Sequence, residues 1–182
     1  VYIGLPNHLH KEWIIRAALA GKHVLCEKPF VMDEQEAREV AAVLSSASVR
    51  CMEAIMYRSH PLTLKLCELM REKILGDIKL IHAVYAADIK DLANPIGSSA
   101  ILNLGCYPAS LIRLLVGQSL GLPFAEPNKM LSSGLLGVAQ RDHQASTVLH
   151  FDRDIVAIVS TADDMGMFFK LDIYGERGHL HM

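Results

Sequence analysis

The fold is decided by residues 1–29, VYIGLPNHLHKEWIIRAALAGKHVLCEKP. Residues 1–5 and residues 23–26 are apolar runs, and each predicts a short buried strand. Residues 8–20 lie between them and predict a helix that Asn7 caps. Strand, helix and strand in so short a stretch predict a βαβ unit. We expect its strands to be parallel, because strands buried on both faces are apolar throughout rather than alternating.

The same pattern continues toward residue 57. Asp33 and Glu36 have the spacing of a capping box and predict a helix to about residue 47. Residues 49–56 predict a third strand, which completes a second βαβ crossover. The sequence therefore predicts α/β structure for this part of the chain.

The pattern changes after Pro61, which is placed to start a helix that runs to about Lys73. Ser99 can cap a further helix that ends at Gly117. The other periodic segments predict strands, over residues 78–87, 130–139, 146–151, 155–161 and 168–174. No helix separates the later strands, so antiparallel pairing is the economical arrangement and predicts an α+β unit with an open sheet.

The composition is that of a folded globule of 182 residues, with 51% hydrophobic and 21% charged residues. A net charge of -2 lacks the basic footprint that a nucleic-acid binder needs, so we expect no nucleic-acid partner. We expect no membrane association either, because no apolar run approaches the ~20 residues that cross a bilayer. The 4 cysteines are widely spaced with no CxxC, which predicts reduced, mostly buried thiols and a cytoplasmic location.

Two segments stand out as candidates for chemistry. Glu27, Lys28 and Pro29 follow the second strand, at the edge of a parallel sheet where open α/β sheets bind ligands. Position alone leaves open a solvated Glu27–Lys28 pair and a proline that merely ends the strand. Gly105 and Pro108 lie inside a predicted helix, where glycine costs about 1 kcal/mol and proline about 3 kcal/mol. Their presence there indicates a packing or functional demand.

These segments belong to a series of separated motifs. The series is Ile3-Gly4-Leu5-Pro6-Asn7-His8-Leu9-His10, then Ala20-Gly21-Lys22-His23-Val24-Leu25-Cys26-Glu27-Lys28-Pro29, Tyr57-Arg58-Ser59-His60-Pro61 and Ile101-Leu102-Asn103-Leu104-Gly105-Cys106-Tyr107-Pro108. In this order they resemble the glucose-fructose oxidoreductase/inositol dehydrogenase/MocA (Gfo/Idh/MocA) family. The last motif resembles that family's Asp-x-Gly-x-His or Asp-x-Gly-x-Tyr helix, in the tyrosine-type branch that includes dihydrodiol dehydrogenases.

The resemblance implies two partial domains in an α/β fold. Residues 1–57 would be the C-terminal part of a Rossmann-like, NAD(P)-binding parallel-sheet domain. Residues 58–182 would be an α+β domain for substrate binding and oligomerisation, with a largely antiparallel open sheet. The chain contains no G-x-G-x-x-G turn, so we expect an N-terminal truncation and weak or no cofactor binding by residues 1–182 alone. The resemblance also implies an incomplete C-terminus.

The resemblance also implies roles for individual residues. Lys28 and Tyr107 would be the catalytic pair, and the Lys28–Pro29 peptide bond would be cis. Cofactor contacts would come from Pro6, Asn7, His10, Glu27, Lys28 and Pro29, and substrate contacts from Lys28, Arg58, Asn103 and Tyr107. The cofactor would be NAD or NADP, because the residue that distinguishes them lies outside this sequence.

The chemistry of the pair is consistent with hydride transfer. Moving hydride between a nicotinamide and a carbinol carbon requires a group that takes or gives the proton of the oxygen. A tyrosine ordinarily ionises only near pH ~10, and a neighbouring ammonium favours the phenolate. Lys28 would thus assist Tyr107 and polarise the substrate carbonyl. The alternative is that Tyr107 is a half-buried helix tyrosine with a satisfied hydroxyl.

One residue departs from the family pattern. Asn103 stands where the family usually has Asp, and an amide forms hydrogen bonds but carries no charge. We expect an NAD(P)-dependent oxidoreductase acting on a CH-OH or C=O group of a sugar, polyol or dihydrodiol-like substrate. The alternative that Asn103 leaves open is a non-catalytic regulatory protein that binds a nucleotide or a sugar on the same scaffold.

The remaining polar motifs point to no further site. His8 and His10 do not share a helical face, and His179 and His181 lack a third ligand nearby, so we expect no bound metal. Asp163-Asp164 predicts a turn. Members of the family that the chain resembles commonly pair through the antiparallel sheet, so we expect a homodimer or a larger homo-oligomer.

Overall fold

The computed structural model describes residues 1–92, 96–137 and 140–182. The chain forms two compact units. Unit 1 comprises Val1–Ile55 with Leu92–Ser98, and unit 2 comprises Met56–Asp91 with Ser99–Met182. Asn94, Pro95 and Ala139, which fall in the predicted loop and strand, lie outside the described residues.

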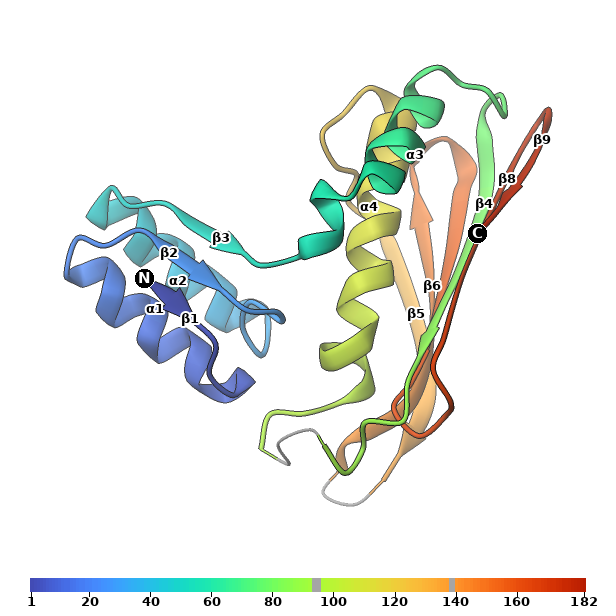
Figure 1. The fold of residues 1–182 in the computed structure, drawn as a ribbon. Coiled ribbons are helices and arrows are strands. Elements are labelled where there is room, and N and C mark those ends of the chain that lie inside the picture. The colour runs from blue at the N-terminus through green and yellow to red at the C-terminus, as the bar shows by residue number, and fades with distance from the viewer. Residues whose placement is uncertain (93–95, 138–139) are drawn as a thin grey trace. The chain divides into compact units, whose positions relative to one another are not determined.

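Unit 1 is built on a three-stranded parallel sheet, sheet A, in the order β1-β2-β3. The strands are β1 (Tyr2–Ile3), β2 (Val24–Cys26) and β3 (Cys51–Glu53), and the helices are α1 (His10–Leu19) and α2 (Glu34–Ala47). Each helix connects two neighbouring parallel strands, and the two helices pack against each other (Figure 1). The predicted parallel βαβ arrangement is confirmed, with strands shorter than the apolar runs that predicted them.

The core of unit 1 lies between sheet A and its two helices. The buried residues are Ile3, Ile14, Val24, Cys26, Val31 and Val40. Asp33 caps α2 as predicted, since its side chain accepts a hydrogen bond of 2.8 Å from the backbone N–H of Glu36. Burial raises the pKa of the Cys26 thiol to about 12, so this cysteine is a packing residue rather than a reactive one.

The predicted capping role of Asn7 is wrong. A 3-10 turn, Asn7–Leu9, precedes α1, and neither the turn nor the helix has a side-chain cap. The Asn7 amide instead donates to the backbone oxygen of Gly97 over 2.8 Å. The Asn7 side chain, which local spacing assigned to the start of the helix, is therefore bonded to a residue that is distant in sequence.

Unit 2 is built on a six-stranded sheet, sheet B, in the order β5-β6-β7-β4-β8-β9. Its strands are β4 (Ile78–Ala86), β5 (Lys129–Leu136), β6 (Asp142–Phe151), β7 (Ile155–Ala162), β8 (Phe168–Gly175) and β9 (Gly178–His181). Four of the neighbouring pairs are antiparallel, and β4 with β7 is parallel. The largely antiparallel sheet is confirmed. The parallel pair arises because β4 is inserted between strands that come later in the chain.

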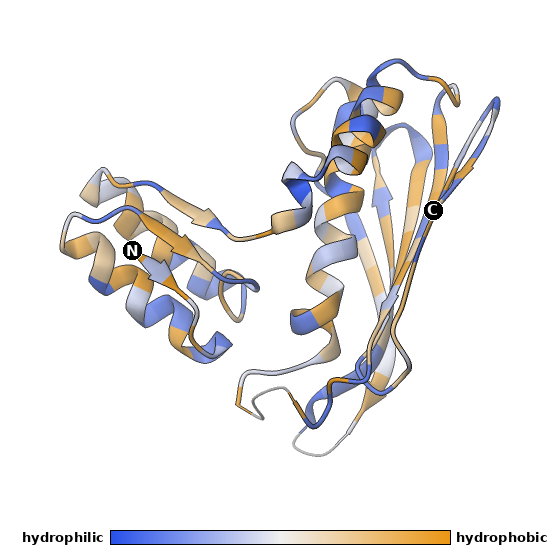
Figure 2. Ribbon diagram, viewed as in Figure 1, coloured by the Kyte–Doolittle hydropathy of each residue, from blue (hydrophilic) through white to orange (hydrophobic). Residues whose placement is uncertain are grey.

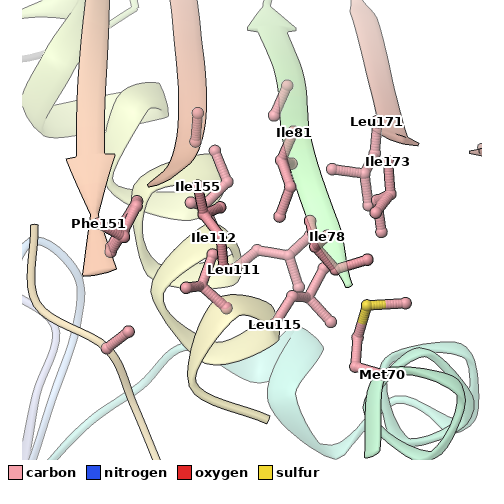
Figure 3. Close-up of a cluster of buried hydrophobic side chains, with 14 of the residues drawn as sticks. Met70, Ile78, Ile81, Leu111, Ile112, Leu115, Phe151, Ile155, Leu171 and Ile173 are labelled. Carbon is pink, nitrogen blue, oxygen red and sulfur yellow. The ribbon is translucent and has the colours of Figure 1, made fainter. Parts of the chain in front are cut away.

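The helices of unit 2 are α3 (Pro61–Arg71) and α4 (Cys106–Leu120), and α4 packs on β4 and β7. Figure 2 shows that hydrophobic residues recur along the strands of sheet B. The close-up of the core shows Met70, Ile78, Ile81, Leu111, Ile112, Leu115, Phe151, Ile155, Leu171 and Ile173 between helices and sheet (Figure 3). Burying each such side chain stabilises the fold by roughly 1.5–3 kcal/mol.

The start of α4 explains the glycine and proline in the predicted helix. Ser99 caps the segment as expected, accepting a 3.0 Å hydrogen bond from the backbone N–H of Leu102. The chain then forms a π-helix, Ile101–Gly105, before α4 begins at Cys106. Pro108 lies in the turn of α4 that directly follows this π-helix, so the helix-breaking residue and the irregular turn occur together. π-Helical turns are frequent at functional sites.

The predicted helix end at Gly117 is wrong. The helix continues to Leu120, and Gly121, with φ 76°, forms its left-handed cap. Gly117 lies buried inside the helix, and a Cβ there would stand 2.5 Å from the Cα of Phe124. A close backbone approach, rather than a helix end, thus requires the absence of a side chain at this position.

We predict that Gly117→Ala destabilises the protein. Alanine in a helix interior ordinarily gains about 1 kcal/mol over glycine, but here the added methyl group enters occupied space and costs about 1–3 kcal/mol. The free energy of unfolding in urea measures the change. Gly166→Ala is the control, because nothing lies within 4 Å of a Cβ at that position. Unchanged stability of the Gly117 variant would contradict the packing argument.

Candidate active site

The Glu27-Lys28-Pro29 loop leaves sheet A at the carboxyl end of β2. The backbone N–H of Glu27 donates to the oxygen of Ile3 over 2.9 Å, and the Tyr2 hydroxyl donates to the Glu27 carboxylate over 2.7 Å. This hydrogen bond to Glu27 raises the pKa of Tyr2. The Lys28–Pro29 peptide bond is cis, as the family resemblance implies. Lys28 is half-buried in this loop.

Two side chains from other elements hold the far end of the same loop. The ring of His10, the first residue of α1, lies 2.8 Å from the backbone oxygen of Pro29. The carboxylate of Glu53, the last residue of β3, accepts a 2.8 Å hydrogen bond from the N–H of Phe30. The loop that carries Lys28 is thus held from three directions within unit 1.

The residues at this edge of sheet A suit one half of a nicotinamide dinucleotide. Asn7 follows β1, and Glu27 and Lys28 follow β2, so an amide, a carboxylate and an ammonium group lie at the carboxyl ends of neighbouring strands. Such donors and acceptors match the hydroxyls of a ribose and the amide of a nicotinamide. The chain has no glycine-rich turn for the phosphates. The residues present therefore fit the nicotinamide riboside end of the cofactor.

Unit 2 contains a cavity of about 680 Å³ that Tyr107 lines. The residues around it come from the segments before and within α3, from α4, from β4, from β8 and the residue before it, and from the end of the sequence. They are Met56, Tyr57, Ser59, His60, Pro61, Leu62, Thr63, Leu66, Tyr85, Tyr107, Leu111, Met167, Phe169 and Met182. Polar groups in this lining are few: hydroxyls, one imidazole and backbone. The cavity is therefore predominantly apolar, as ligand pockets commonly are.

Four aromatic rings form one connected wall of this cavity. The Tyr107 ring lies 5.6 Å from Tyr85 and 6.3 Å from Tyr57, between ring centroids. Tyr85 in turn meets Phe169 edge to face at 5.6 Å. Edge-to-face pairs at such distances are mutually attractive, so each ring orients the next. Burial raises the pKa of Tyr57, which keeps its hydroxyl protonated.

Asn103 and Arg58 lie in unit 2 but are absent from the described lining of the cavity. Asn103 is buried in the π-helix, four residues before Tyr107. The Arg58 guanidinium donates to the Ser110 hydroxyl over 2.6 Å and lies 4.7 Å from the centre of the Phe124 ring. The two contacts connect the segment before α3 to α4 and to the loop that follows α4. The substrate contact of Arg58 stays a prediction.

The sequence interpretation missed the aromatic partners of Tyr107. Tyr85 and Phe169 belong to predicted strands, but their pairing across β4 and β8 depends on a register that no local pattern gives. The alternation of side chains along a strand could have indicated part of this arrangement. It places Tyr85 on the same face of β4 as Ile81 and Ala83, which face the core.

The remaining acidic and histidine motifs have structural partners. His181 lies 2.6 Å from Asp172, and the ring of His179 stacks on Tyr174. Asp163 is fully buried, and its carboxylate lies 2.7 Å from a ring nitrogen of His143. The prediction of a turn at Asp163-Asp164 did not include this contact. Across residues 1–92, 96–137 and 140–182, no group of three or more His, Cys, Asp or Glu could hold a metal ion. In the same residues, no helix has the length and apolar character of a membrane span.

Comparison with known proteins assigns both units to one family. Residues 1–55 match the model described as "Oxidoreductase family, NAD-binding Rossmann fold", and residues 63–181 match the "GFO/IDH/MocA C-terminal domain". The chain therefore belongs to the GFO/IDH/MocA oxidoreductase family. The family resemblance of the sequence motifs is confirmed.

Individual relatives cover the chain almost completely. A D-xylose 1-dehydrogenase (NADP(+)) of Haloferax volcanii is 34% identical over 90% of this chain and 50% of its own length. A trans-1,2-dihydrobenzene-1,2-diol dehydrogenase of Xenopus laevis is 26% identical over 98% of this chain and 53% of its own length. The crystal structure of a 3-ketoreductase from Actinomadura kijaniata in complex with NADP superposes with a TM-score of 0.81 at 26% identity. This match covers all of this chain and 54% of the other.

The chain spans about half the length of the curated relatives that it matches. The family and the fold are therefore properties of these residues.

We predict that Glu53→Ala destabilises the protein by about 1–3 kcal/mol, because the partly buried N–H of Phe30 loses its acceptor. Glu53→Gln is the matched control, since its amide oxygen can still accept this hydrogen bond. Urea unfolding of the two variants and the parent protein measures the difference. Equal stability of the alanine and glutamine variants would show that this hydrogen bond does not hold the loop.

Proposed function

We propose that this chain is part of an NAD(P)-dependent oxidoreductase that moves hydride between a nicotinamide and a CH-OH or C=O group of its substrate. A bound nicotinamide would supply or accept the hydride. Residues 1–57 would contribute part of the nucleotide-binding domain, and residues 58–182 the substrate domain. The observation that carries the proposal is Tyr107, whose ring borders an apolar cavity of about 680 Å³ in a helix that begins with a π-turn.

The proposed roles follow from the chemistry of each side chain. Tyr107 would take the proton of the substrate hydroxyl during oxidation and return it during reduction. Lys28, whose loop is anchored to Ile3, His10 and Glu53, would favour the phenolate and polarise the carbonyl oxygen. Asn103 would accept or donate a hydrogen bond to a second hydroxyl of the substrate.

We propose that the cofactor contacts are made by Pro6, Asn7, Glu27, Lys28 and Pro29. These residues lie at the carboxyl edge of sheet A, where parallel sheets bind nucleotides. Both cofactors occur among similar proteins: the D-xylose dehydrogenase is named for NADP(+), and a structural neighbour is complexed with NADH and myo-inositol. The cofactor is NAD or NADP.

In the complete protein, we predict that Lys28→Met and Tyr107→Phe each lower kcat by about 100- to 10,000-fold, since each removes a group that handles the proton or the charge on oxygen. Cofactor binding is largely retained. Stopped-flow measurement of NAD(P)H absorbance gives kcat, and fluorescence titration gives cofactor affinity.

Lys22→Met is the matched control for Lys28, because Lys22 is exposed in the turn after α1. An unchanged kcat in the Lys28 variant would contradict the proposed role. Cofactor binding with no turnover by the parent protein, over a broad panel of sugars and diols, would instead favour a regulatory binding protein. That second function is motivated by Asn103, which carries no charge.

The cavity favours one part of the proposed substrate range. Sugars and polyols present hydroxyls on every carbon and require many buried hydrogen-bond partners. The cavity offers Tyr85, Phe169 and several methionine and leucine side chains instead. We therefore propose a substrate with a hydrocarbon ring next to the reacting hydroxyl, as in a dihydrodiol.

We predict that kcat/KM for a cyclic dihydrodiol exceeds that for a free aldose by at least about 10-fold, because each buried CH₂ contributes about 0.8 kcal/mol. Phe169→Ala reduces this ratio, since it removes one apolar wall of the cavity. Steady-state kinetics with matched cyclic diols and aldoses measures the ratio. A higher kcat/KM for the aldose would contradict the substrate class and leave the hydride-transfer proposal intact.

We further propose that the protein is a homodimer or larger homo-oligomer that pairs through sheet B. The face of sheet B opposite α4 carries Leu131, Val148 and Ile158 in register, and among the described residues of unit 2 no helix covers this face (Figure 1). Leu131 and Leu135 are more than half exposed. Exposed apolar surface on a sheet is commonly covered by a partner.

We also propose a cytoplasmic location for this protein, which the free cysteines support.

We predict that the protein is a dimer or larger at micromolar concentration and that Leu131→Asp with Leu135→Asp shifts it to monomer, because buried unpaired charge opposes association. Light scattering measures the mass. Leu122→Asp, at an exposed leucine outside sheet B, is the control. A monomeric parent protein would contradict the proposed pairing.

A further inference from the structure

His10 joins the two loops that carry the proposed cofactor contacts. Its side chain is fully buried in unit 1. Nδ1 lies 2.8 Å from the backbone oxygen of Pro29, and Nε2 lies 2.7 Å from the backbone oxygen of Leu5. Leu5 follows β1 and Pro29 follows β2, so a single ring bridges the ends of two neighbouring parallel strands.

The His10 ring is held at both of its nitrogens. Each short contact joins a ring nitrogen to a backbone carbonyl oxygen, which accepts hydrogen bonds and does not donate them. The tautomer of the ring sets which of the two nitrogens donates. In either tautomer the ring fills the space between the two loops and donates a hydrogen bond to one of them.

We propose that His10 is a positioning residue whose ring, held between the backbone oxygens of Leu5 and Pro29, fixes the loop carrying Lys28. The inference rests on the proposed role of Lys28. It gives His10 a different task from the direct cofactor contact that the family resemblance implies, because both ring nitrogens are engaged by the backbone and the side chain has no exposed surface.

The placement of this contact makes it effective. Pro29 is the residue directly after Lys28, and the peptide bond between them is cis. Tyr2 and Glu53 hold the loop at Glu27 and Phe30, on either side. The His10 ring holds it beside the lysine itself. Small displacements of a reacting group, of about 1 Å, can lower catalytic rates by about 100-fold.

The first test examines the parent protein without any substitution. Protein labelled with ¹⁵N-histidine is studied by NMR at neutral pH, with the His10 signals assigned by their absence in a His10 variant. If that variant does not fold, variants of the exposed histidines assign the signals by elimination. We expect a ring N–H of His10 that exchanges slowly with solvent, because the ring is buried and hydrogen-bonded to the backbone. Exchange as fast as that of the exposed histidines would overturn the proposal.

The second test separates positioning from cofactor contact and from general stability. His10→Phe removes both ring nitrogens and keeps a ring, and His10→Gln keeps a shorter polar side chain. We expect kcat to fall by about 10- to 100-fold in His10→Phe and less in His10→Gln, with the KM for cofactor nearly unchanged. His8→Phe is the control, because the His8 ring makes a longer, 3.2 Å contact to the oxygen of Ile96.

Three results would overturn the proposal. A raised cofactor KM with unchanged kcat would show direct contact with the cofactor. A lowered melting temperature with unchanged kcat of the folded enzyme would show a purely structural role. An equal fall in kcat in the His8→Phe and His10→Phe variants would show that the effect is not specific to the His10 bridge. An unaffected kcat in Lys28→Met contradicts the proposed function instead, and the NMR measurement still tests His10 by itself.

Discussion

The packing of α4 against sheet B is the interaction on which the substrate side of this protein depends. Leu111, Ile112 and Leu115 are buried between the helix and the sheet, and this burial fixes the rotation of the helix. Tyr107 lies one turn before Leu111, so its ring is directed to the same side and borders the cavity. A helix free to rotate would present Tyr107 to no defined surroundings. The core and the proposed proton-transfer residue thus share one element.

The cofactor side depends on a different constraint. Parallel strands end at the same edge of a sheet, so the loops after β1 and β2 are neighbours although residues 1–5 and residues 27–30 are separated by a whole helix. The sheet brings the loops to one edge, and side chains fix them there. His10 bridges the two loops, and Glu53 of β3 reaches the second one. The precision of the Lys28 position therefore comes from α1 and β3 as much as from its own strand.

Much of the fold was predictable from local patterns. The parallel βαβ unit follows from the order of apolar runs and a helical segment along the chain, and the Asp33 and Ser99 caps depend on residues three positions apart. All three are as predicted. The errors have a common physical cause. Asn7 bonds to a loop some 90 residues away, and Gly117 leaves space for the backbone of Phe124 beyond the end of the helix, so contacts outside the local helix pattern decided both. The π-turn before α4 likewise has no local signature beyond the misplaced glycine and proline.

The sequence by itself determined the family, the kinds of element and the residue types at the proposed site, because these are carried by short motifs whose spacing is visible in one dimension. Tertiary structure decided what surrounds each of those residues. The insertion of β4 between β7 and β8 sets Tyr85 opposite Phe169 and builds the aromatic wall around Tyr107. The seating of His10 between two carbonyl oxygens likewise requires three segments to meet. Such arrangements depend on strand order and register, which are set by burial over the whole unit rather than by neighbouring residues.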